Sequence, residues 1–363
     1  MKRLNSVLFV IDNLSGGGAE RVLAILANNF AALGIVTSVG MLQSHGKPME
    51  YDLTGGVAVV DFSRNTAKGR RGVLRALFRL RRFVKTQKPD VVIPFMLHNA
   101  VMTLGACLGL RCPAVIRFAI MQKRWKTLFT RIAGPMLLPK ARGAVYQTEE
   151  QKAFFRKHMR NEGVILPNPV ETRPSWDEPR SYEGKTVIAA GRLSGQKNFS
   201  LLIRAFSALE KSFPDWRLII YGEGIARDDL QYEVENLGLT SKISLPGFSK
   251  DIHEVMHRAP VFVMSSLYEG MPNALIEALC AGCACVTTNF DGGATSILVR
   301  DGDNGLVVPN DDTDAMADAL RRLMLSEDLR RTLGQSAARL REKFNARKIA
   351  LQWVDYLESV ISI

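Results

Sequence analysis

The chain has 363 residues, of which 47% are hydrophobic and 23% charged, and this composition excludes a disordered or collagen-like protein. Its length exceeds what one hydrophobic core usually supports, so we expect two domains. Strand and helix patterns alternate along the chain and predict an α/β fold with parallel sheets. The sequence enters an apolar strand directly near residue 7, and we therefore expect no signal peptide.

The net charge of +12 is concentrated in the first half of the chain. Residues 1–170 hold 26 Lys and Arg against 9 Asp and Glu, a net charge of +17, whereas residues 171–363 hold 22 against 27, a net charge of −5. This asymmetry predicts an anionic partner for the first half. Because no nucleic-acid recognition motif accompanies the basic residues, we expect a membrane surface and not a nucleic acid.

The first predicted unit, residues 7–34, is an apolar strand, a loop with Gly16, Gly17 and Gly18, and a helix. Glycines at a helix start let the backbone approach a ligand, and the unpaired N–H groups there attract phosphate. The dinucleotide pattern G-x-G-x-x-G is incomplete because Arg21 takes the place of the last glycine. The following strand also ends without the acid that a nicotinamide cofactor requires, which disfavours a dehydrogenase.

Residues 64–88 contain ten basic residues and no acid. Apolar residues recur there at helical spacing, and a basic amphipathic helix of this kind is typical of proteins that bind anionic membranes. The alternative is that the apolar stripe packs on the sheet while only the cations face water; we expect both to hold. The apolar positions are Val73, Leu74, Leu77, Phe78, Leu80, Phe83 and Val84.

The residues expected to contact the membrane lie in two basic stretches, the second of which carries an aromatic residue suited to the lipid interface. They are Arg75, Arg79, Arg82, Lys123, Arg124, Trp125 and Lys126.

Residues 91–110 are nearly apolar enough to span a bilayer, but Pro94, His98 and Asn99 interrupt the run. We interpret this segment as a buried strand, a loop that carries His98, and a helix. The segment 171–184 is rich in Pro, Ser and charge and reads as a linker between a first domain, 1–170, and a second domain, 185–344. A last amphipathic helix follows at 345–363.

The second domain opens with a strand, a loop that carries Arg192 and Lys197, and a helix, over residues 187–206. Two fixed cations at the end of a strand suit a diphosphate, because arginine offers a planar fork and lysine a point charge. An ordinary basic loop is the alternative. A strand, a glycine turn and a helix follow over 216–238, and a short strand ends at Gly247 and Phe248.

The most informative segment is SSLYEGMPNALIEALCAGCACV, which places Glu269 eight residues before Glu277. A buried strand leads into a turn with Glu269, Gly270 and Met271, and Pro272 opens a helix that starts near Asn273 and contains Glu277. The helix N-terminus suits a phosphate, while the carboxylates suit a ribose diol and the hydroxyls of a sugar. The alternative is a surface helix with two solvated glutamates.

Two patterns resemble metal sites. Cys280, Cys283 and Cys285 straddle a helix end and a strand, and we interpret them as small buried thiols. Asp301 and Asp303 flank a glycine in what reads as a turn. We expect no metal.

In order and spacing, the motifs of residues 187–314 together with GGGAERV resemble the retaining GT-B glycosyltransferases of the family-4 type. The resemblance implies two Rossmann-like domains that face each other across a cleft, with the last helix packed back on the first domain. It also implies a nucleotide-sugar donor, retention of anomeric configuration, and no cofactor or metal.

For the site, the resemblance implies that Arg192 and Lys197 hold the diphosphate, that Glu269 holds the sugar, and that Gly247 and Phe248 contact the base. Glu277, Gly270, Met271, Asn273 and the loop Gly16–Gly18 complete the donor site. Related enzymes carry a histidine where Ala119 stands here, and His98 is a candidate substitute. A structural role for His98 is the alternative.

We therefore expect a hexosyltransferase that uses a UDP-hexose or UDP-N-acetylhexosamine and acts in polysaccharide biosynthesis. The expected acceptor is a lipid-linked saccharide or a lipopolysaccharide core, reached from the cytoplasm at the inner face of the cytoplasmic membrane. A UDP-N-acetylglucosamine 2-epimerase and a non-catalytic lipid-phosphate-binding protein are the alternatives.

Overall fold

The computed structural model describes residues 2–66, 69–119, 128–177 and 184–362. The chain forms two compact units, Met1–Glu171 with Asn345–Ile363 and Thr172–Phe344. Each is an α/β unit with parallel strands, as the alternation of strand and helix patterns predicted. Residues 172–177 of the segment expected to be a linker belong to the second unit, and Trp176 among them is buried.

The first unit contains a four-stranded parallel sheet of order β3-β2-β1-β4 and a three-stranded sheet of order β5-β6-β7. Two isolated parallel bridges, Val92 to Ala114 and Phe95 to Arg117, connect β4 with β5. The strands are β1 (Ser6–Ile11), β2 (Val36–Met41), β3 (Val57–Asp61), β4 (Val91–Pro94), β5 (Val115–Arg117), β6 (Gly143–Tyr146) and β7 (Val164–Ile165). The helices of this unit are α1 (Gly18–Ala32), α2 (Arg70–Gln87), α3 (Leu97–Ala106), α4 (Leu128–Leu137), α5 (Glu149–Arg156) and α14 (Ala346–Ile361).

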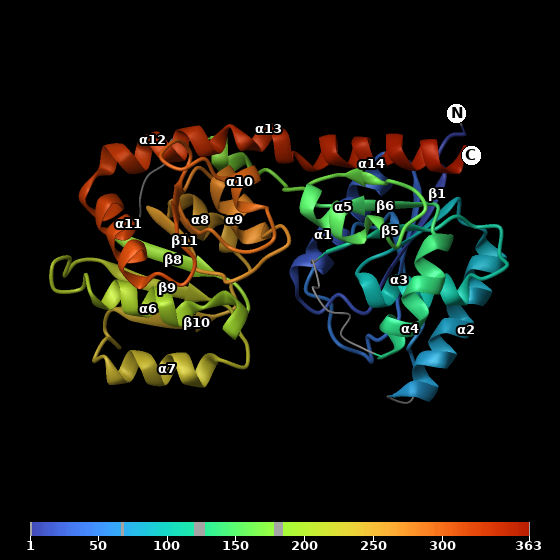
Figure 1. Ribbon diagram of the computed structural model, residues 1–363, viewed down its shortest axis with the longest axis horizontal. Coiled ribbons are helices and arrows are strands. Elements are labelled where there is room, and N and C mark those ends of the chain that lie inside the picture. The colour runs from blue at the N-terminus through green and yellow to red at the C-terminus, as the bar shows by residue number, and fades with distance from the viewer. Residues whose placement is uncertain (1, 67–68, 120–127, 178–183, 363) are drawn as a thin grey trace. The chain divides into compact units, whose positions relative to one another are not determined.

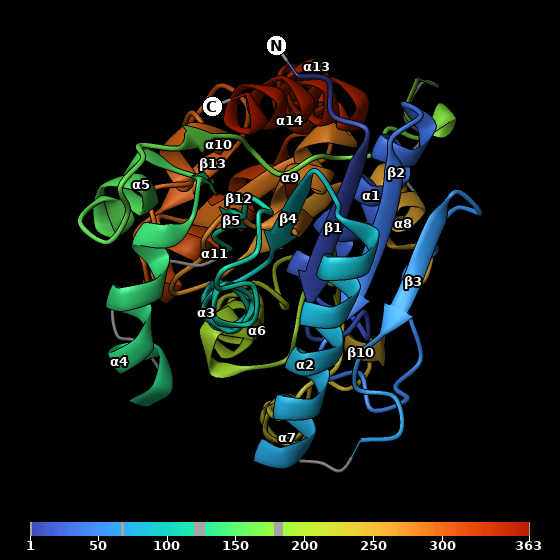
Figure 2. The same cartoon turned by 90° about the vertical axis from the view of Figure 1, so that its right-hand side faces the viewer.

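Helices cover both faces of the first sheet because side chains of successive strand residues point to opposite faces. Phe9 of β1 belongs to a buried cluster with α1 and with Trp353 of α14. Leu8, its neighbour in the strand, belongs to a cluster with Leu80 of α2. Figure 2 shows β1, β2 and β3 side by side with α2 along them, and Figure 1 shows α14 in red.

The second unit contains one six-stranded parallel sheet of order β10-β9-β8-β11-β12-β13. Its strands are β8 (Thr186–Ala190), β9 (Arg217–Tyr221), β10 (Ile243–Gly247), β11 (Val261–Met264), β12 (Ala284–Thr288) and β13 (Leu306–Val308). Its helices are α6 (Phe199–Ser207), α7 (Arg227–Asn236), α8 (Ile252–Arg258), α9 (Asn273–Cys280), α10 (Thr295–Leu298), α11 (Thr313–Leu325), α12 (Glu327–Ala338) and α13 (Leu340–Phe344).

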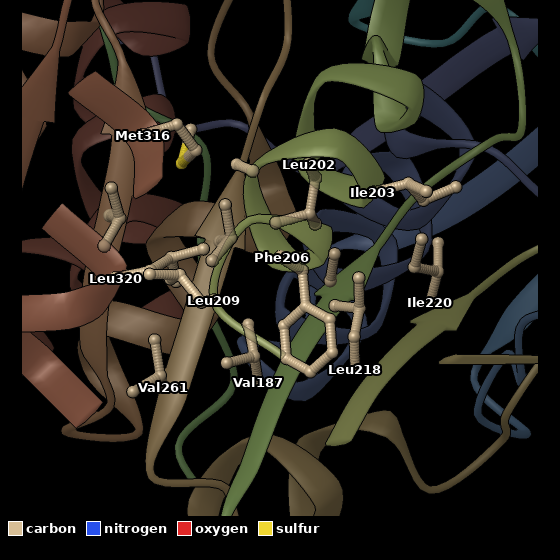
Figure 3. Packing of buried hydrophobic residues seen from close by; sticks show 14 of the residues in the cluster. Val187, Leu202, Ile203, Phe206, Leu209, Leu218, Ile220, Val261, Met316 and Leu320 are labelled. Atoms are coloured by element: carbon tan, nitrogen blue, oxygen red, sulfur yellow. The ribbon is translucent and has the colours of Figure 1, made fainter. Parts of the chain in front are cut away.

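One face of this sheet packs against α6 and α11. Val187, Leu218 and Val261 from three neighbouring strands form one buried cluster with Phe206 of α6 and Leu320 of α11 (Figure 3). A fixed core of this kind sets the positions at which β8 and β11 end. The loops that follow these two strands carry most of the predicted donor-site residues.

Candidate donor site in the second unit

The candidate site lies where the strand order of the second unit changes direction. The chain runs from β8 outward through β9 and β10, and then returns to place β11 on the other side of β8. In open α/β sheets, ligands bind outside the carboxyl ends of the two strands at such a switch point. Lys197 follows β8 and Glu269 follows β11, so both predicted residues occupy this position.

Lys197 and Glu269 form an ion pair. The Lys197 Nζ lies 2.7 Å from Glu269 Oε1, and the two side chains are only 16% and 11% exposed. The stem of Lys197 passes Gly191, where an added Cβ would lie 3.0 Å from Lys197 Cε. Glycine at this position therefore lets the lysine reach across to the neighbouring loop.

Backbone and side-chain hydrogen bonds join the same two loops. Leu267 N donates to Gln196 O at 2.9 Å, and Gln196 Nε2 donates to Tyr268 O at 2.8 Å. Ser265 Oγ donates to Lys197 O at 2.8 Å. These contacts fix the loop after β8 against the loop after β11, so the charged pair is held on an ordered backbone.

A third loop, which follows β12, also contacts Glu269. Glu269 N donates to Asp291 O at 2.9 Å, and Asp291 N donates to Leu267 O at 3.2 Å. Gly292 has φ +123°, and a Cβ there would lie 1.9 Å from Glu269 O. Only glycine permits this approach and this backbone conformation.

Glu277 of α9 is 3% exposed, which contradicts the alternative of a solvated surface glutamate. Its Oε2 lies 3.6 Å from His253 Nε2 of α8, and the other ring nitrogen, Nδ1, lies 3.5 Å from Arg173. A buried carboxylate needs such partners because desolvation disfavours its charge. The sequence pattern did not identify His253, which lies 24 residues before Glu277.

The helix that carries Glu277 begins at Asn273, as predicted, after Pro272 in the N-cap position. Proline offers no side-chain acceptor, so the N-cap residue Pro272 does not cap this helix with its side chain. Gly270 and Met271 precede it in the loop, and Met271 is buried. The N-terminus of α9 therefore directly follows the loop that carries Glu269.

The remaining predicted donor residues of the second unit also lie at or just after the ends of strands of the same sheet. Arg192 follows β8 and is exposed, and no described residue forms an ion pair with it. Gly247 ends β10 with φ +91°, and Phe248 beside it is 57% exposed. An exposed aromatic ring and an exposed guanidinium are thus available at the edge where Lys197 lies.

In the first unit, Gly16 and Gly17 lie between β1 and α1, and Gly18 is the first residue of α1. Gly17 N, however, donates to the hydroxyl of Tyr51 at 3.2 Å, and that hydroxyl donates to Gly17 O at 3.0 Å. The amide of Gly17 is therefore engaged within the protein. Tyr51 was not identified from the sequence.

His98, at the start of α3, contacts Asp12, which directly follows β1. His98 Nε2 lies 2.5 Å from Asp12 Oδ2, and Gln43 Nε2 donates to Asp12 Oδ1 at 3.0 Å. Sequence analysis selected His98 but missed Asp12, because 86 residues separate the two. Ala119, which the resemblance aligned with the family histidine, follows β5.

The predicted membrane residues fall into two groups. Lys123, Arg124, Trp125 and Lys126 lie outside the described residues. Arg75, Arg79 and Arg82 lie on α2 and are exposed, but Arg79 Nη1 donates to Phe62 O at 3.1 Å and to Arg64 O at 2.6 Å. Arg79 therefore connects α2 to the loop after β3 through hydrogen bonds.

The apolar stripe of α2 is not wholly buried, contrary to the packing expected from its spacing. Leu80 and Val84 are buried, whereas Leu74 and Phe78 are 66% and 76% exposed. The stripe is wider than the surface that the sheet and α3 cover. Among helices in the described ranges, none is both long and apolar enough to cross a membrane.

The patterns that resembled metal sites are accounted for by local structure. Cys280, Cys283 and Cys285 are buried free thiols, and burial raises the pKa of Cys280 to about 12. Asp301 accepts a hydrogen bond from Val307 N, and Asp303 pairs with Arg300 at 2.7 Å. Across the part of the chain that the structure describes, no cluster of three or more His, Cys, Asp or Glu suits a metal ion.

Comparisons with known proteins match both halves of the chain to glycosyltransferase families. The family described as "Glycosyl transferases group 1" matches residues 173–340, and "Glycosyltransferase Family 4" matches residues 16–173. A relative from Campylobacter jejuni, GalNAc-alpha-(1->4)-GalNAc-alpha-(1->3)-diNAcBac-PP-undecaprenol alpha-1,4-N-acetyl-D-galactosaminyltransferase, is 26% identical over 98% of each chain.

Two solved structures share the fold. A sucrose-phosphate synthase of Thermosynechococcus elongatus superposes with a TM-score of 0.84 at 15% identity, over 99% of each chain. Anabaena HepE, solved in complex with UDP and glucose, superposes with a TM-score of 0.80 at 19% identity, over 97% of this chain and 99% of HepE. The two family matches together span residues 16–340, and the chain therefore belongs to the GT-B glycosyltransferases of the family-4 type.

Proposed function

We propose that this glycosyltransferase moves a sugar from a UDP-hexose or UDP-N-acetylhexosamine to a lipid-linked saccharide or a lipopolysaccharide-core acceptor. The observation that carries the proposal is the Lys197–Glu269 pair at the switch point between β8 and β11. The C. jejuni relative is named for an undecaprenol-linked acceptor, and the HepE title names UDP. Both names support the choice of substrate class.

In this proposal, charge on the leaving diphosphate is stabilised by groups that are already in place. Lys197, Arg192 and the N-terminus of α9 supply positive potential where the bond from the sugar to the diphosphate breaks. Because Lys197 is held by the loops described above, it needs little reorganisation during the reaction. We propose a retaining, metal-independent transfer, in which these groups provide the charge that a metal ion supplies in other enzymes.

In this proposal, the carboxylates of Glu269 and Glu277 bind different parts of the donor. Glu269 holds hydroxyls of the sugar with the oxygen that Lys197 leaves available, and Glu277 accepts hydrogen bonds from the ribose diol. His253 keeps the buried Glu277 carboxylate oriented. Phe248 and the backbone of Gly247 form the contact with the base.

Membrane association is part of the proposed function. Arg75 and Arg82 of α2 offer cations to anionic headgroups, and Leu74 and Phe78 beside them offer apolar side chains. This surface would bring the enzyme to a lipid-linked acceptor. We propose the inner face of the cytoplasmic membrane as its location.

The test is turnover with a panel of nucleotide sugars, read as release of nucleotide. We expect UDP-sugars to raise the melting temperature, and Glu277→Gln or Lys197→Met to lower turnover by about tenfold or more. Wild-type turnover in both variants would contradict the site assignment. Conversion of UDP-N-acetylglucosamine to UDP-N-acetylmannosamine without an acceptor would instead support an epimerase.

A stability control is needed because Lys197 is paired. Breaking a fully buried pair costs up to about 3–5 kcal/mol, since it leaves one charge without a partner. The double variant Lys197→Met with Glu269→Gln removes both charges and should recover part of the stability lost in Lys197→Met alone. Its turnover should remain low, which separates loss of the site from loss of the fold.

A further inference from the structure

A cavity of about 800 Å³ lies in the first unit, at the amino ends of its strands. Among the residues that line it, Asp90, Ala114 and Arg142 directly precede β4, β5 and β6. Ligands of open α/β sheets bind outside the carboxyl ends of the strands, which is the opposite edge. Small-molecule sites in proteins have volumes of about 300–1,000 Å³, and this cavity is within that range. The proposed function gives the cavity no role.

The lining of this cavity is strongly basic. It contains one acid, Asp90, and five exposed basic residues, which are Lys2, Lys88, Arg111, Lys140 and Arg142. Lys2 pairs with Asp90, whereas no described residue forms an ion pair or a hydrogen bond with the side chains of the other four. Because like charges repel each other, an anion bound among these four cations lowers the electrostatic energy of the site.

Asp90 cannot neutralise the four cations, because its carboxylate already has partners. Its Oδ1 lies 2.8 Å from Lys2 Nζ, and its Oδ2 accepts hydrogen bonds from the N–H groups of Asn5 and Ser6, each at 3.0 Å. Burial raises the pKa of Asp90, but the hydrogen bonds from Lys2, Asn5 and Ser6 together lower it below its usual value. Asp90 therefore remains ionised and is fully used by the start of the chain.

The backbone holds two of the four cations in place. Lys88 ends α2 with φ +49°, in the left-handed conformation that glycine usually supplies at a helix end. Its N–H donates to Val84 O at 3.0 Å. Arg142 N donates to Ala114 O at 2.9 Å, and Arg142 O accepts a hydrogen bond from Asn161 Nδ2 at 2.7 Å. Both side chains therefore extend from ordered backbone.

The rest of the lining is mainly aliphatic. Leu104 belongs to the last turns of α3, and Val360 and Ile361 end α14. Leu108, after α3, is 45% exposed and offers apolar surface to a ligand. Among the described residues that line the cavity there is no aromatic ring on which a nucleotide base could stack. The lining therefore favours an anion with an aliphatic group over a nucleotide.

We propose that this cavity binds a phosphate monoester that carries an aliphatic group. A phosphate monoester has a charge of about −1.5 to −2 at pH 7, which suits several cations better than a single carboxylate does. Arg111 and Arg142 offer paired N–H donors to its oxygens, and Lys88 and Lys140 offer point charges. The aliphatic group covers Leu108 and its apolar neighbours. The ligand can be a soluble molecule or a membrane lipid, and the experiment below distinguishes the two sources.

The first measurement is calorimetric titration of the full chain with dihexanoyl phosphatidic acid, at concentrations below those at which it forms micelles. We expect binding at least about tenfold tighter than that of inorganic phosphate, because burial of each CH₂ group contributes about 0.8 kcal/mol. Dihexanoyl phosphatidylcholine should also bind at least tenfold more weakly, because choline caps its phosphate. Equal affinities for phosphatidic acid and inorganic phosphate, or no binding of phosphatidic acid, would overturn the proposal.

Variants of exposed residues assign the binding to the cavity. Lys140→Gln with Arg142→Gln should weaken the binding of phosphatidic acid by about tenfold or more. Leu108→Gln should weaken it as well, but should leave the affinity for inorganic phosphate unchanged. Lys211→Gln with Arg322→Gln is the matched control, since it removes two exposed cations from the second unit. Wild-type affinity in both cavity variants, or an equal loss in the control, would place the ligand elsewhere and contradict the proposal.

Vesicles identify the source of the ligand. For a membrane lipid, Lys140→Gln with Arg142→Gln should weaken co-sedimentation with vesicles that contain phosphatidic acid. The loss should exceed that with phosphatidylglycerol vesicles of equal surface charge, because phosphatidylglycerol is a diester. For a soluble ligand, the same variant should bind both kinds of vesicle like the wild type, while its affinity for dihexanoyl phosphatidic acid is still lowered.

Discussion

Glu269 depends on one glycine that lies 23 residues further along the chain. Gly292 allows the backbone of its loop to contact Glu269 O, at a φ that side-chain-bearing residues rarely adopt. The two loops also exchange hydrogen bonds through Asp291. The loops that follow β11 and β12 therefore together set the backbone position of Glu269.

Gly292→Ala should move Glu269 and lower donor turnover by about tenfold or more, because small displacements of positioned groups are costly in catalysis. Gly302→Ala is the matched control: Gly302 has φ +75°, but nothing lies within 4 Å of its added Cβ. Both variants carry the backbone penalty, and only Gly292→Ala collides with the site. Equal turnover in the two variants would show that this contact does not position Glu269.

For individual residues, the sequence pattern located those whose positions depend on nearby segments of the chain. The spacing from Glu269 to Glu277, the helix start at Asn273 and the cations after β8 follow from local strand, turn and helix signals. The partners of these residues could not be predicted in the same way. His253 and Asp12 reach Glu277 and His98 through sheet and helix packing, which local periodicity does not encode.

Helix α2 shows what the spacing of apolar residues predicts about a helix and what it does not. Its spacing predicted an amphipathic helix, and the helix is present from Arg70 to Gln87. Burial of the whole apolar stripe was the wrong expectation, since Leu74 and Phe78 point away from the packed surface. Helical spacing identifies an apolar face, but the neighbouring elements decide how much of that face is covered.

The exposed side chains of α2 lead to a prediction about membranes. Leu74→Gln with Phe78→Gln should weaken binding to anionic vesicles by about tenfold or more, because each apolar side chain contributes about 1.5–3 kcal/mol when buried in full. Arg75→Glu with Arg82→Glu should weaken it as well, and more strongly at low salt. Co-sedimentation with vesicles measures both.

The matched control for this experiment is Ile225→Gln in the second unit, where Ile225 is 96% exposed. It removes an exposed apolar side chain that lies outside the proposed surface, and should leave vesicle binding unchanged. Equal binding by the α2 variants and the wild type would contradict membrane docking through α2 without affecting the donor site.

For the whole molecule, the α/β class and the family were predictable because strand, loop and helix signals recur in a fixed order along the chain. The apolar pattern of the last helix did not indicate which surface the helix packs against. The apolar side of α14 predicts burial, but the choice of surface depends on packing: Trp353 is buried in the first unit, and Tyr356 accepts a hydrogen bond from Ala144 N at 3.0 Å. Family resemblance supplied this expectation where periodicity could not.

The charge asymmetry is also a property of the whole chain. The second half is acidic overall, yet its candidate site gathers Arg192 and Lys197 at one sheet edge. A net charge therefore gives no guide to the ligand of a particular site. The basic first half and the locally basic donor site are separate features, and each has its own experiment.

The most direct measurement is a crystal structure of the full chain with UDP. The account predicts the diphosphate beside Lys197, Arg192 and the N-terminus of α9, with the ribose at Glu277. UDP bound elsewhere, with these side chains unchanged and facing solvent, would contradict it.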